Sequence, residues 1–523
     1  MKQNTLEKNI KFIEAQILSS QGRHHESKLI YESLLSRNKE NHLIYLNLGV
    51  TNFLLGDFVG AEKLLKTSIS LNKKSSIACH ALGNSLASLG RPEEAVMAYD
   101  QGIAIESSYP DLYNDRGLAE MMLLNFSKAR QNFQRAMDLD PKFLDAITNL
   151  GIALSHLNLY KEASQIFEKA ITLDAQSYLA HLNLGLTLQF LGRLEESLNC
   201  FNRAHKLNPS DEYTNWNKAN LLLLMGQFEE GWRLYESRWR SIKKQDVRDF
   251  NRPLWLGEES LTSKTIFIHA EQGFGDVIQF SRYIALLQLL DAKVIFEVQP
   301  SLINLMKSLQ CASLEVIAKG SNIPAFDYQC PIMSLPLAFK TSIKTIPHEM
   351  PYLFPTEKKI IEWKEKIKNS LRLKVGIAWS GSKTLFHTHH RSIDLKTFSK
   401  IFNDKFDFHV LQKEIDEKDL GLLKNMSNVH LYQEQLSDFS DTAALIYEMD
   451  LIITIDTSVA HLAGALAKKT LILLPFVPDW RWLMTGEKNP WYPTTKLFRQ
   501  TASLDWNEVI EKLVAELQDY LSV

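Results

Sequence analysis

Five glycines recur at a fixed interval of 34 residues in the first half of the chain: Gly49, Gly83, Gly117, Gly151 and Gly185. Ala219 occupies the next position of the same register. A fixed period of this length is typical of arrays of helix–turn–helix repeats, in which each unit buries its apolar face against its neighbours. The period then stops and about half the chain remains, so the sequence predicts a helical solenoid joined to a second region.

Other positions of the repeat follow the same period. A small residue recurs where two helices must approach closely: Ala61, Ala95, Ala129 and Ala163. A large apolar or aromatic residue follows each of them: Leu65, Tyr99, Phe133 and Phe167. This pattern closely resembles the tetratricopeptide repeat (TPR). Six repeats are predicted from about His42 to Trp239, and a weaker one before them has Gly22 at its turn and Tyr31 at its aromatic position. The resemblance implies a right-handed superhelix with a concave groove.

An asparagine often stands two residues before the periodic glycine, as at Asn47, Asn149, Asn183 and Asn217. In the repeat family this position faces the groove, where an amide offers donors and an acceptor to an extended peptide. Asparagine is also the common residue at this position of the repeat in general. Two interpretations stay open, a peptide-binding ladder and ordinary repeat consensus. Under both, we expect the array to bind a protein partner or to recruit an acceptor.

Composition excludes several classes of function. The formal net charge is −2, so no overall basic field attracts nucleic acid. Four cysteines are scattered and form no C-x-x-C pair, which fits a reducing compartment without a zinc site or a disulfide framework. The N-terminus lacks a signal-peptide core, and no stretch approaches the roughly 20 apolar residues of a transmembrane helix. We therefore expect a cytoplasmic protein without a transmembrane segment, with peripheral contact at the inner membrane left open.

The second half alternates short apolar runs with helical segments. The expected strands are 265–269, 293–298, 374–379, 407–412, 451–455 and 470–475. Such runs are typical of buried parallel strands, and their alternation with helices predicts doubly wound α/β domains. The predicted fold class is α + α/β, an N-terminal TPR α-solenoid followed by two Rossmann-type domains. We place the solenoid at 1–245, a packed junction containing Trp255 at 246–262, and the two α/β halves at 263–360 and 361–523.

In open α/β sheets, ligands bind beyond the carboxyl ends of the strands. After the first expected strand come the acceptor-loop candidates, Glu271, Gln272, Gly273 and Gly275, and then Asp276. The glycines allow a tight turn that leaves Asp276 at a helix start, pointing into the cleft. The simpler alternative is that Asp276 only caps a helix.

Polar residues also follow the later strands. Ser380 and Gly381 suit an anion held by backbone amides, and Arg391 suits a phosphate or sugar. Gln412 and Lys413 end another strand, where the lysine either neutralises a diphosphate or is an exposed surface charge. His387, His389 and His390 are too closely spaced in a polar loop to indicate a metal site.

A denser cluster follows 451–455, with Asp456, Thr457, Ser458 and His461 at the start of a helix rich in small residues. A helix N-terminus with adjacent hydroxyls is suited to bind an anion. A capped helix start with a buried histidine is the alternative. Trp482 is expected to wall the cleft and to stack on a base or sugar.

These motifs resemble the ADP-heptose–lipopolysaccharide heptosyltransferase family, which has the GT-B fold. Gly275-Asp276 matches that family's Gly-Asp pair, and Asp456-Thr457 with His461 matches its Asp-Thr-x-x-x-His donor site. The resemblance implies a GT-B glycosyltransferase with its acceptor side at 263–360 and its nucleotide-sugar donor side at 361–523. It further implies inversion, Asp276 as catalytic base, and no metal or other cofactor.

Two other functions remain open. The first is a non-catalytic TPR scaffold with a degenerate glycosyltransferase-like domain. The second is a sugar-nucleotide epimerase of the same fold, which leaves the repeats without a purpose. The motifs do not specify the sugar, the base, or whether the acceptor is a protein or a glycan.

Overall fold

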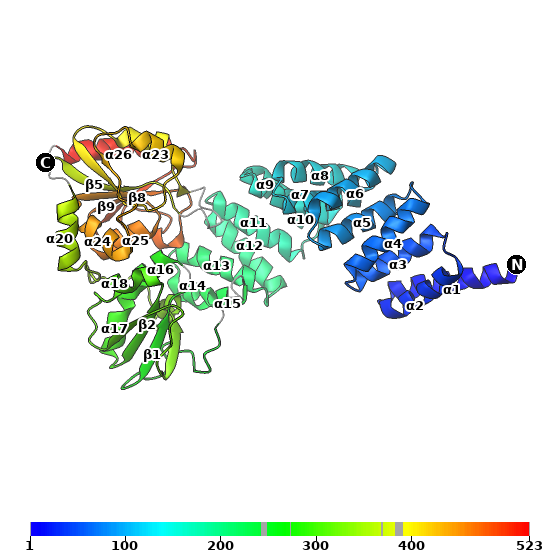
Figure 1. Cartoon of the computed structure of the whole chain (residues 1–523), viewed down its shortest axis with the longest axis horizontal. Coiled ribbons are helices and arrows are strands. Elements are labelled where there is room, and N and C mark those ends of the chain that lie inside the picture. The colour runs from blue at the N-terminus through cyan, green and yellow to red at the C-terminus, as the bar shows by residue number, and fades with distance from the viewer. Residues whose placement is uncertain (1, 242–247, 272, 368–369, 382–390, 522–523) are drawn as a thin grey trace. The chain divides into compact units, whose positions relative to one another are not determined.

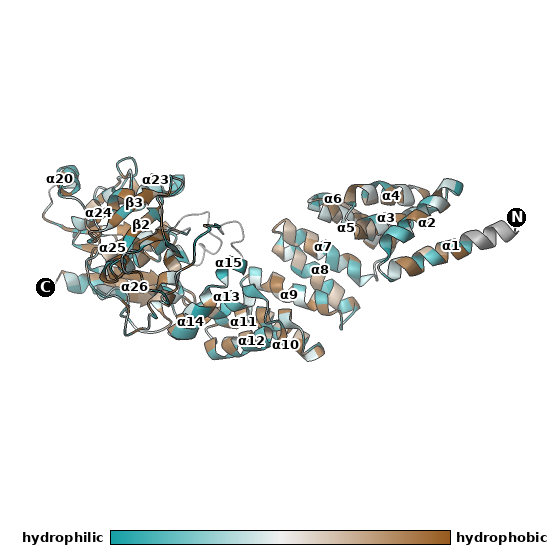
Figure 2. Ribbon diagram, turned by 90° about the horizontal axis from the view of Figure 1, so that it is seen from below, coloured by the Kyte–Doolittle hydropathy of each residue, from teal (hydrophilic) through white to brown (hydrophobic). Residues whose placement is uncertain are grey.

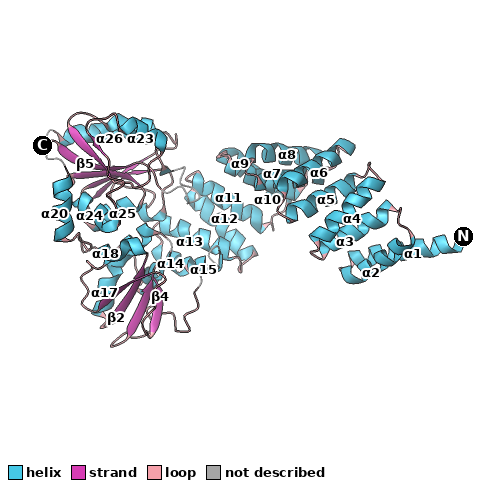
Figure 3. Cartoon of the chain, viewed as in Figure 1, coloured by secondary structure: helices cyan, strands magenta, loops and turns pink. Residues whose placement is uncertain are grey.

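The computed structural model describes residues 2–241, 248–271, 273–367, 370–381 and 391–521, with side chains from residue 9 onward (Figure 1). The chain divides into two compact units. The first comprises residues 1–191 with 206–208, and the second comprises residues 192–205 with 209–523. The first unit is helical, and the parallel strands lie in the second (Figure 3).

Consecutive helix pairs make up the repeats. Their bounds are α1 Lys2–Ser20, α2 His24–Arg37, α3 His42–Leu54, α4 Phe58–Leu71, α5 Ser76–Ser88, α6 Pro92–Ile105, α7 Pro110–Met122, α8 Phe126–Leu139, α9 Leu144–His156, α10 Tyr160–Leu173, α11 Tyr178–Phe190, α12 Leu194–Leu207, α13 Glu212–Leu224 and α14 Phe228–Tyr235. Polar and apolar residues alternate along these helices, as an amphipathic repeat requires (Figure 2). The first pair is the weaker repeat expected from the sequence, and its Tyr31 is buried.

Close packing explains the periodic glycine. A Cβ atom on Gly83 would lie 2.3 Å from Cε1 of Tyr99, and one on Gly151 would lie 2.5 Å from Cε1 of Phe167. No side chain fits where an aromatic ring of the paired helix already lies against the backbone. The glycine is therefore a packing requirement in the pairs where such a ring lies against the backbone, whereas Ala219 of α13 shows that the last pair accommodates a methyl group.

The last repeat packs with the sheets. Trp232 of α14 is 1% exposed, and its ring centroid lies 5.1 Å from that of Trp480 and 6.5 Å from that of Trp491. The short helix α15 (Arg238–Ser241) follows, and Trp255 is buried against Phe339. The compact units therefore separate near residue 191, whereas the repeat pattern of the sequence extends to about residue 245.

The first sheet is parallel, with strand order β3-β2-β1-β4. Its strands are β1 Thr265–His269, β2 Lys293–Val298, β3 Leu314–Ala318 and β4 Tyr328–Pro331. The helices beside it are α16 Phe274–Phe280, α17 Ile284–Leu289, α18 Ile303–Met306 and α19 Leu335–Ala338. Helix α16 begins directly after the β1 loop, so it brings the expected acceptor-loop residues to the carboxyl edge of the sheet.

The second sheet is also parallel, with strand order β10-β9-β8-β5-β6-β7. Its strands are β5 Leu373–Ala378, β6 Phe406–Val410, β7 Val429–His430, β8 Leu451–Ile455, β9 Thr470–Leu474 and β10 Thr495–Arg499. Its helices are α20 Glu357–Lys366, α22 Leu395–Phe398, α23 Glu417–Leu423, α24 Phe439–Tyr447, α25 Ser458–Ala465 and α26 Trp506–Tyr520, with the 3₁₀ turn η5 at Trp480–Trp482.

The six expected strands are all present, within one or two residues of their predicted ends. The four strands that the sequence did not predict are β3, β4, β7 and β10, and each of them lies at the edge of its sheet. The inner strands are almost wholly buried, whereas the edge strands carry partly exposed residues and are interrupted by polar side chains. Continuous apolar runs therefore revealed the inner strands only.

Candidate functional site

A cleft of about 570 Å³ lies between the carboxyl edges of the two sheets, within the second unit. It is bounded by the start of α16 on one side and by the starts of α24 and α25 on the other. Most of the site residues expected from the sequence line it: Gly273, Gly275, Asp276, Ser380, Gly381, Arg391, Gln412, Lys413, Asp456, Thr457, Ser458 and His461.

Asp276 lies in the first turn of α16, and its side chain is 27% exposed. Its Oδ1 accepts a hydrogen bond from Nη2 of Arg481 at 2.6 Å. A Cβ atom on Gly273 would lie 2.5 Å from Asp276 Oδ2, so the glycine leaves room for the carboxylate.

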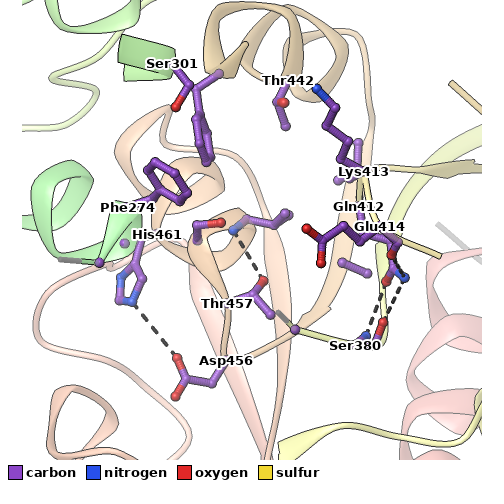
Figure 4. Close-up of a pocket in the computed structure, with 18 of the residues that line it drawn as sticks. Phe274, Ser301, Ser380, Gln412, Lys413, Glu414, Thr442, Asp456, Thr457 and His461 are labelled. Carbon is purple, nitrogen blue, oxygen red and sulfur yellow. Dashed lines mark hydrogen bonds and ion pairs between the residues drawn. The ribbon is translucent and has the colours of Figure 1, made fainter. Parts of the chain in front are cut away.

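The two sides of the cleft meet where α16 packs against α25. Gly275 faces His461, and a Cβ atom on this glycine would lie 2.7 Å from Cδ2 of the imidazole. The glycine thus permits the close approach of two helix starts that belong to different sheets. Phe274, at the start of α16, projects into the cleft (Figure 4), where its ring lies 5.1 Å from that of Phe439.

His461 is buried beside Asp456. Nδ1 of its ring is 3.0 Å from the Tyr492 hydroxyl, and Nε2 is 4.0 Å from Asp456 Oδ1 (Figure 4). Burial, together with the nearby arginines, lowers the pKa of His461 well below its ordinary value, so the imidazole is neutral at physiological pH. Trp482 stacks on the imidazole with ring centroids 5.2 Å apart.

Asp456 is a carboxyl group of the cleft whose pKa is raised. Burial and the neighbouring carboxylate of Asp479 raise the pKa of Asp456 to about 6, although Arg391 opposes this shift. Arg391 Nη1 lies 3.9 Å from Asp456 Oδ2. A carboxylate repels phosphate, so Asp456 is better suited to orient Arg391 and His461 than to bind a phosphate directly.

The anion-binding features of the second sheet lie at the start of α25. Thr457 is the N-cap, and its hydroxyl oxygen accepts from the Val459 N–H at 3.3 Å (Figure 4). The first N–H groups of a helix carry partial positive charge. Arg391 and the Ser380–Gly381 segment line the same cleft, and Arg391 Nε has no hydrogen-bond partner among the described residues.

Gln412 has a supporting role. Its Oε1 accepts from the backbone N–H groups of Trp379 and Ser380 at 3.0 and 3.2 Å, and its Nε2 donates to Ser380 Oγ and to the Glu414 carbonyl. Its hydrogen-bonding groups are therefore occupied in holding the Ser380 segment. Lys413 lines the cleft at the same strand end (Figure 4).

Two expected site residues lie outside the lining of the cleft. Glu271 is buried and accepts two hydrogen bonds from Arg238, from Nε at 3.0 Å and from Nη2 at 2.9 Å. It therefore ties α15 to the first sheet, because a buried carboxylate requires a paired cation. Trp482 is fully buried behind His461, so its ring is not available to stack on a base or sugar.

Four further expectations fall outside the described residues. They concern Gln272 and the three histidines of the polar loop, His387, His389 and His390. Among the residues that the structure does describe, no cluster of three or more His, Cys, Asp or Glu side chains is placed to bind a metal ion.

Each groove asparagine already uses one of its two amide N–H donors. Nδ2 of Asn47, Asn183 and Asn217 each donates at 2.8 Å to the carbonyl oxygen four residues earlier in its own helix. Nδ2 of Asn149 donates to Asn114 Oδ1 at 3.0 Å. A peptide ladder at these positions therefore has fewer free donors than the residue type suggests.

Asp479 and Arg481 are cleft residues that the sequence analysis did not identify. They follow β9, just as the expected site residues follow the other inner strands. The same rule could have found them, because ligands bind where parallel strands end. Trp480 and Trp491, which lie near them in the sequence, are buried against each other and against Trp232.

In the part of the chain that the structure describes, no helix is both long and apolar enough to cross a bilayer.

Comparisons with known proteins identify the repeats. Tetratricopeptide repeat models match residues 77–109, 144–177 and 178–211. A curated relative, Protein FlbA of Caulobacter vibrioides, is 24% identical over 55% of this chain and 52% of its own length. The chain thus spans about half the length of the curated relative that it matches.

Solved structures resemble the chain in part. They include YrrB, described as a TPR protein with an unusual peptide-binding site, with 20% identity, a TM-score of 0.32, and coverage of 36% of this chain and 97% of that one. They also include PilF of Pseudomonas aeruginosa, with 17% identity, a TM-score of 0.35, and coverage of 39% and 93%. From the family matches and the helical array, we conclude that the chain contains tetratricopeptide repeats, which imply a role in protein interaction.

Proposed function

We propose that the chain is a metal-independent glycosyltransferase of the GT-B type. In this proposal it moves a sugar from a nucleotide-diphosphate sugar to an acceptor hydroxyl with inversion. The first sheet supplies the acceptor side and the second sheet supplies the donor side. The repeats recruit the protein or glycan acceptor, or bind a partner protein.

One observation carries the proposal. Asp276, from the first sheet's loop, and the start of α25, from the second sheet, line the same cleft. Two-substrate group transfer requires a proton acceptor facing an anion site across a space that holds the reacting atoms. The contact between Gly275 and His461 supports this arrangement, because it brings both helix starts together.

The proposed reaction uses these groups in sequence. The acceptor hydroxyl gives its proton to Asp276 while its oxygen attacks the anomeric carbon of the donor sugar. The bond between that carbon and the diphosphate oxygen breaks, and the electron pair stays on the diphosphate. The N–H groups at the start of α25 and the guanidinium of Arg391 stabilise the departing charge.

A non-catalytic scaffold remains the second candidate because of the charge of the cleft. Among the residues that the structure describes, five carboxylates line it, namely Asp276, Glu414, Asp438, Asp456 and Asp479, against three cations, Arg391, Lys413 and Arg481. This excess of negative charge opposes the binding of a diphosphate. It favours a repeat protein whose glycosyltransferase-like region binds no nucleotide.

A thermal-shift panel of UDP-, GDP- and ADP-sugars, run with EDTA, tests the proposal. A ligand that binds only the native state raises stability by about 2.7 kcal/mol at one hundred times its dissociation constant. We expect one nucleotide to raise the melting temperature above the others without any added metal. If no nucleotide sugar or nucleoside diphosphate stabilises the protein, the scaffold is the better description.

A further inference from the structure

Arg481 carries a buried N–H group that no described residue accepts. Its side chain lines the cleft, and the residue is only 9% exposed. Nη2 donates to Asp276 Oδ1 at 2.6 Å and Nη1 donates to Asp479 Oδ1 at 2.7 Å, whereas Nε has no hydrogen-bond partner in the part of the chain that the structure describes. A buried donor without an acceptor is costly, and such groups often mark the place of a ligand.

A second buried arginine shows how the same edge of a guanidinium is normally used. Arg238 donates from both Nε and Nη2 to the two carboxylate oxygens of Glu271, at 3.0 and 2.9 Å. In Arg481 the same edge consists of Nε and Nη2. Nη2 donates to Asp276 Oδ1, whereas Nε has no acceptor among the described residues. An anion with two oxygens can occupy the whole edge, and phosphate groups bind arginine in this bidentate way.

We propose that Arg481 binds the diphosphate of the donor through Nε and Nη2, and that this exchange releases Asp276 from its ion pair. The inference rests on the proposed glycosyltransferase function and deepens it. The exchange also reduces the electrostatic repulsion between the cleft and a diphosphate. Arg481, which is paired with Asp276 and Asp479, then contributes part of its positive charge to the ligand.

The exchange has a consequence for the reaction. While Asp276 is paired with Arg481, its Oδ1 already accepts a hydrogen bond from the guanidinium. Once the diphosphate takes Nη2, Asp276 Oδ1 no longer accepts from Arg481 and can accept the proton of the acceptor hydroxyl. The same arginine then stabilises the electron pair that the breaking bond leaves on the diphosphate. Donor binding therefore prepares the base, and Asp276 is fully active only when a donor is present.

Isothermal titration of the full-length chain in EDTA tests this proposal, with inorganic pyrophosphate, ADP, GDP and UDP as probes. Hydrogen bonds to charged groups predict that Arg481→Gln weakens the binding of the preferred probe roughly ten- to hundredfold. Arg481→Lys should also weaken it, because lysine keeps the charge but loses the bidentate edge. Asp276→Asn should tighten it several-fold, since it removes a competitor for Nη2 and a repelling charge.

The opposite signs of these effects separate ligand binding from a merely structural ion pair. Arg372→Gln is the matched control, because Arg372 is half-exposed, pairs with Asp407 and does not line the cleft. If Arg481→Gln fails to fold, Arg481→Lys and Asp276→Asn still decide the outcome. Equal binding by the wild type and the Arg481 variants overturns the inference and leaves the proposed function standing, as does weaker binding by Asp276→Asn. No binding of any probe by the wild type overturns the proposed function, and the inference with it.

Discussion

The candidate recognition side chains of the repeat array and those of the cleft differ in whether their N–H donors have acceptors within the protein. In the array, Asn47, Asn183 and Asn217 donate to carbonyl groups of their own helices. In the cleft, Arg391 and Arg481 each keep an Nε without an acceptor among the described residues. Each of these asparagines therefore already uses one donor within its own helix, whereas the cleft holds charged donors that a ligand would satisfy.

This difference shows where residue type is a good guide to function. An asparagine at a groove position can donate from its amide to the backbone carbonyl four residues earlier, because that carbonyl lies within reach in any helix. Arg481 finds a local acceptor in Asp479 for Nη1 but depends on Asp276, far away in the chain, for Nη2. An unsatisfied polar atom therefore points to a ligand where it also lines a cleft, as the Nε atoms of Arg391 and Arg481 do.

The largest expected effect is on catalysis. Asp276→Asn should lower turnover about 10²–10⁴-fold, the usual contribution of a general base, while nucleotide binding is retained. The measurement is the steady-state rate with the nucleotide sugar chosen by the thermal-shift panel. Asp404→Asn, an exposed carboxylate outside the cleft, serves as the control. Unchanged turnover in Asp276→Asn would rule out this aspartate as the base.

Substitutions of two buried aromatic residues, one in each compact unit, test whether nucleotide stabilisation depends on the second unit alone. Trp232→Ala and Phe167→Ala should each cost about 3–5 kcal/mol, because each leaves a large cavity in a packed core. Only Trp232 packs against Trp480, next to the cleft arginine. Calorimetry of the full chain with and without nucleotide should show that Trp232→Ala weakens nucleotide stabilisation and that Phe167→Ala does not. The same loss of nucleotide stabilisation in both variants would contradict the division into two units.

The contact between the two sheets can be tested with one methyl group. Gly275→Ala should destabilise the protein by about 2–3 kcal/mol, because its Cβ would overlap His461. Gly421→Ala, inside α23 and with no atom within 4 Å of the new Cβ, should raise stability slightly. Denaturant unfolding monitored by tryptophan fluorescence measures both variants, and a neutral Gly275→Ala would mean that α16 can move away from α25.

The raised pKa of Asp456 predicts a dependence of stability on pH. The native state holds this proton up to about pH 6, whereas the unfolded chain releases it near the ordinary value of 3.8. The native state therefore loses stability as the pH rises between these values, and the penalty is constant above them. Asp456 faces Asp479, Arg391, Arg481 and His461, and Asp456→Asn removes its charge without changing its size.

Melting temperatures of Asp456→Asn and the wild type should agree most closely at pH 4. The variant should become the more stable protein by on the order of 1–2 kcal/mol at pH 7. Asp404→Asn again provides the control, because Asp404 is exposed and lies outside the cleft. A difference between Asp456→Asn and the wild type that is the same at both pH values would show that the carboxyl titrates normally in the fold.

The smallest expected effect concerns the groove asparagines. Asn47→Ala combined with Asn183→Ala should change stability by less than about 0.5 kcal/mol, because alanine has the higher helix propensity and each amide bonds only to its own helix. Asn149→Ala should cost more, about 0.5–1.5 kcal/mol, since its amide joins α9 to Asn114 of α7. Equal effects would mean that the bond between these helices has no energetic role.

Sequence reasoning went furthest where a residue's environment is set by its neighbours along the chain. The inner strands and the periodic glycines could be predicted, because burial on both faces and a fixed helix spacing leave a continuous or periodic apolar pattern. Most cleft residues could be predicted because they follow those inner strands. Glu271 and Trp482 could not be placed correctly, since only the fold shows that one pairs with Arg238 and the other lies behind His461.

The sequence by itself determined the repeat period, the inner strands of both sheets and the strand ends that carry polar residues. Each of these depends on local spacing, which the order of residues contains directly. The tertiary structure alone decided the edge strands, the packing of the last repeat with the sheets, and the pairing of Asp276 with Arg481. These contacts join residues far apart in the chain, and their free energy depends on burial and distance, which exist only once the chain has folded.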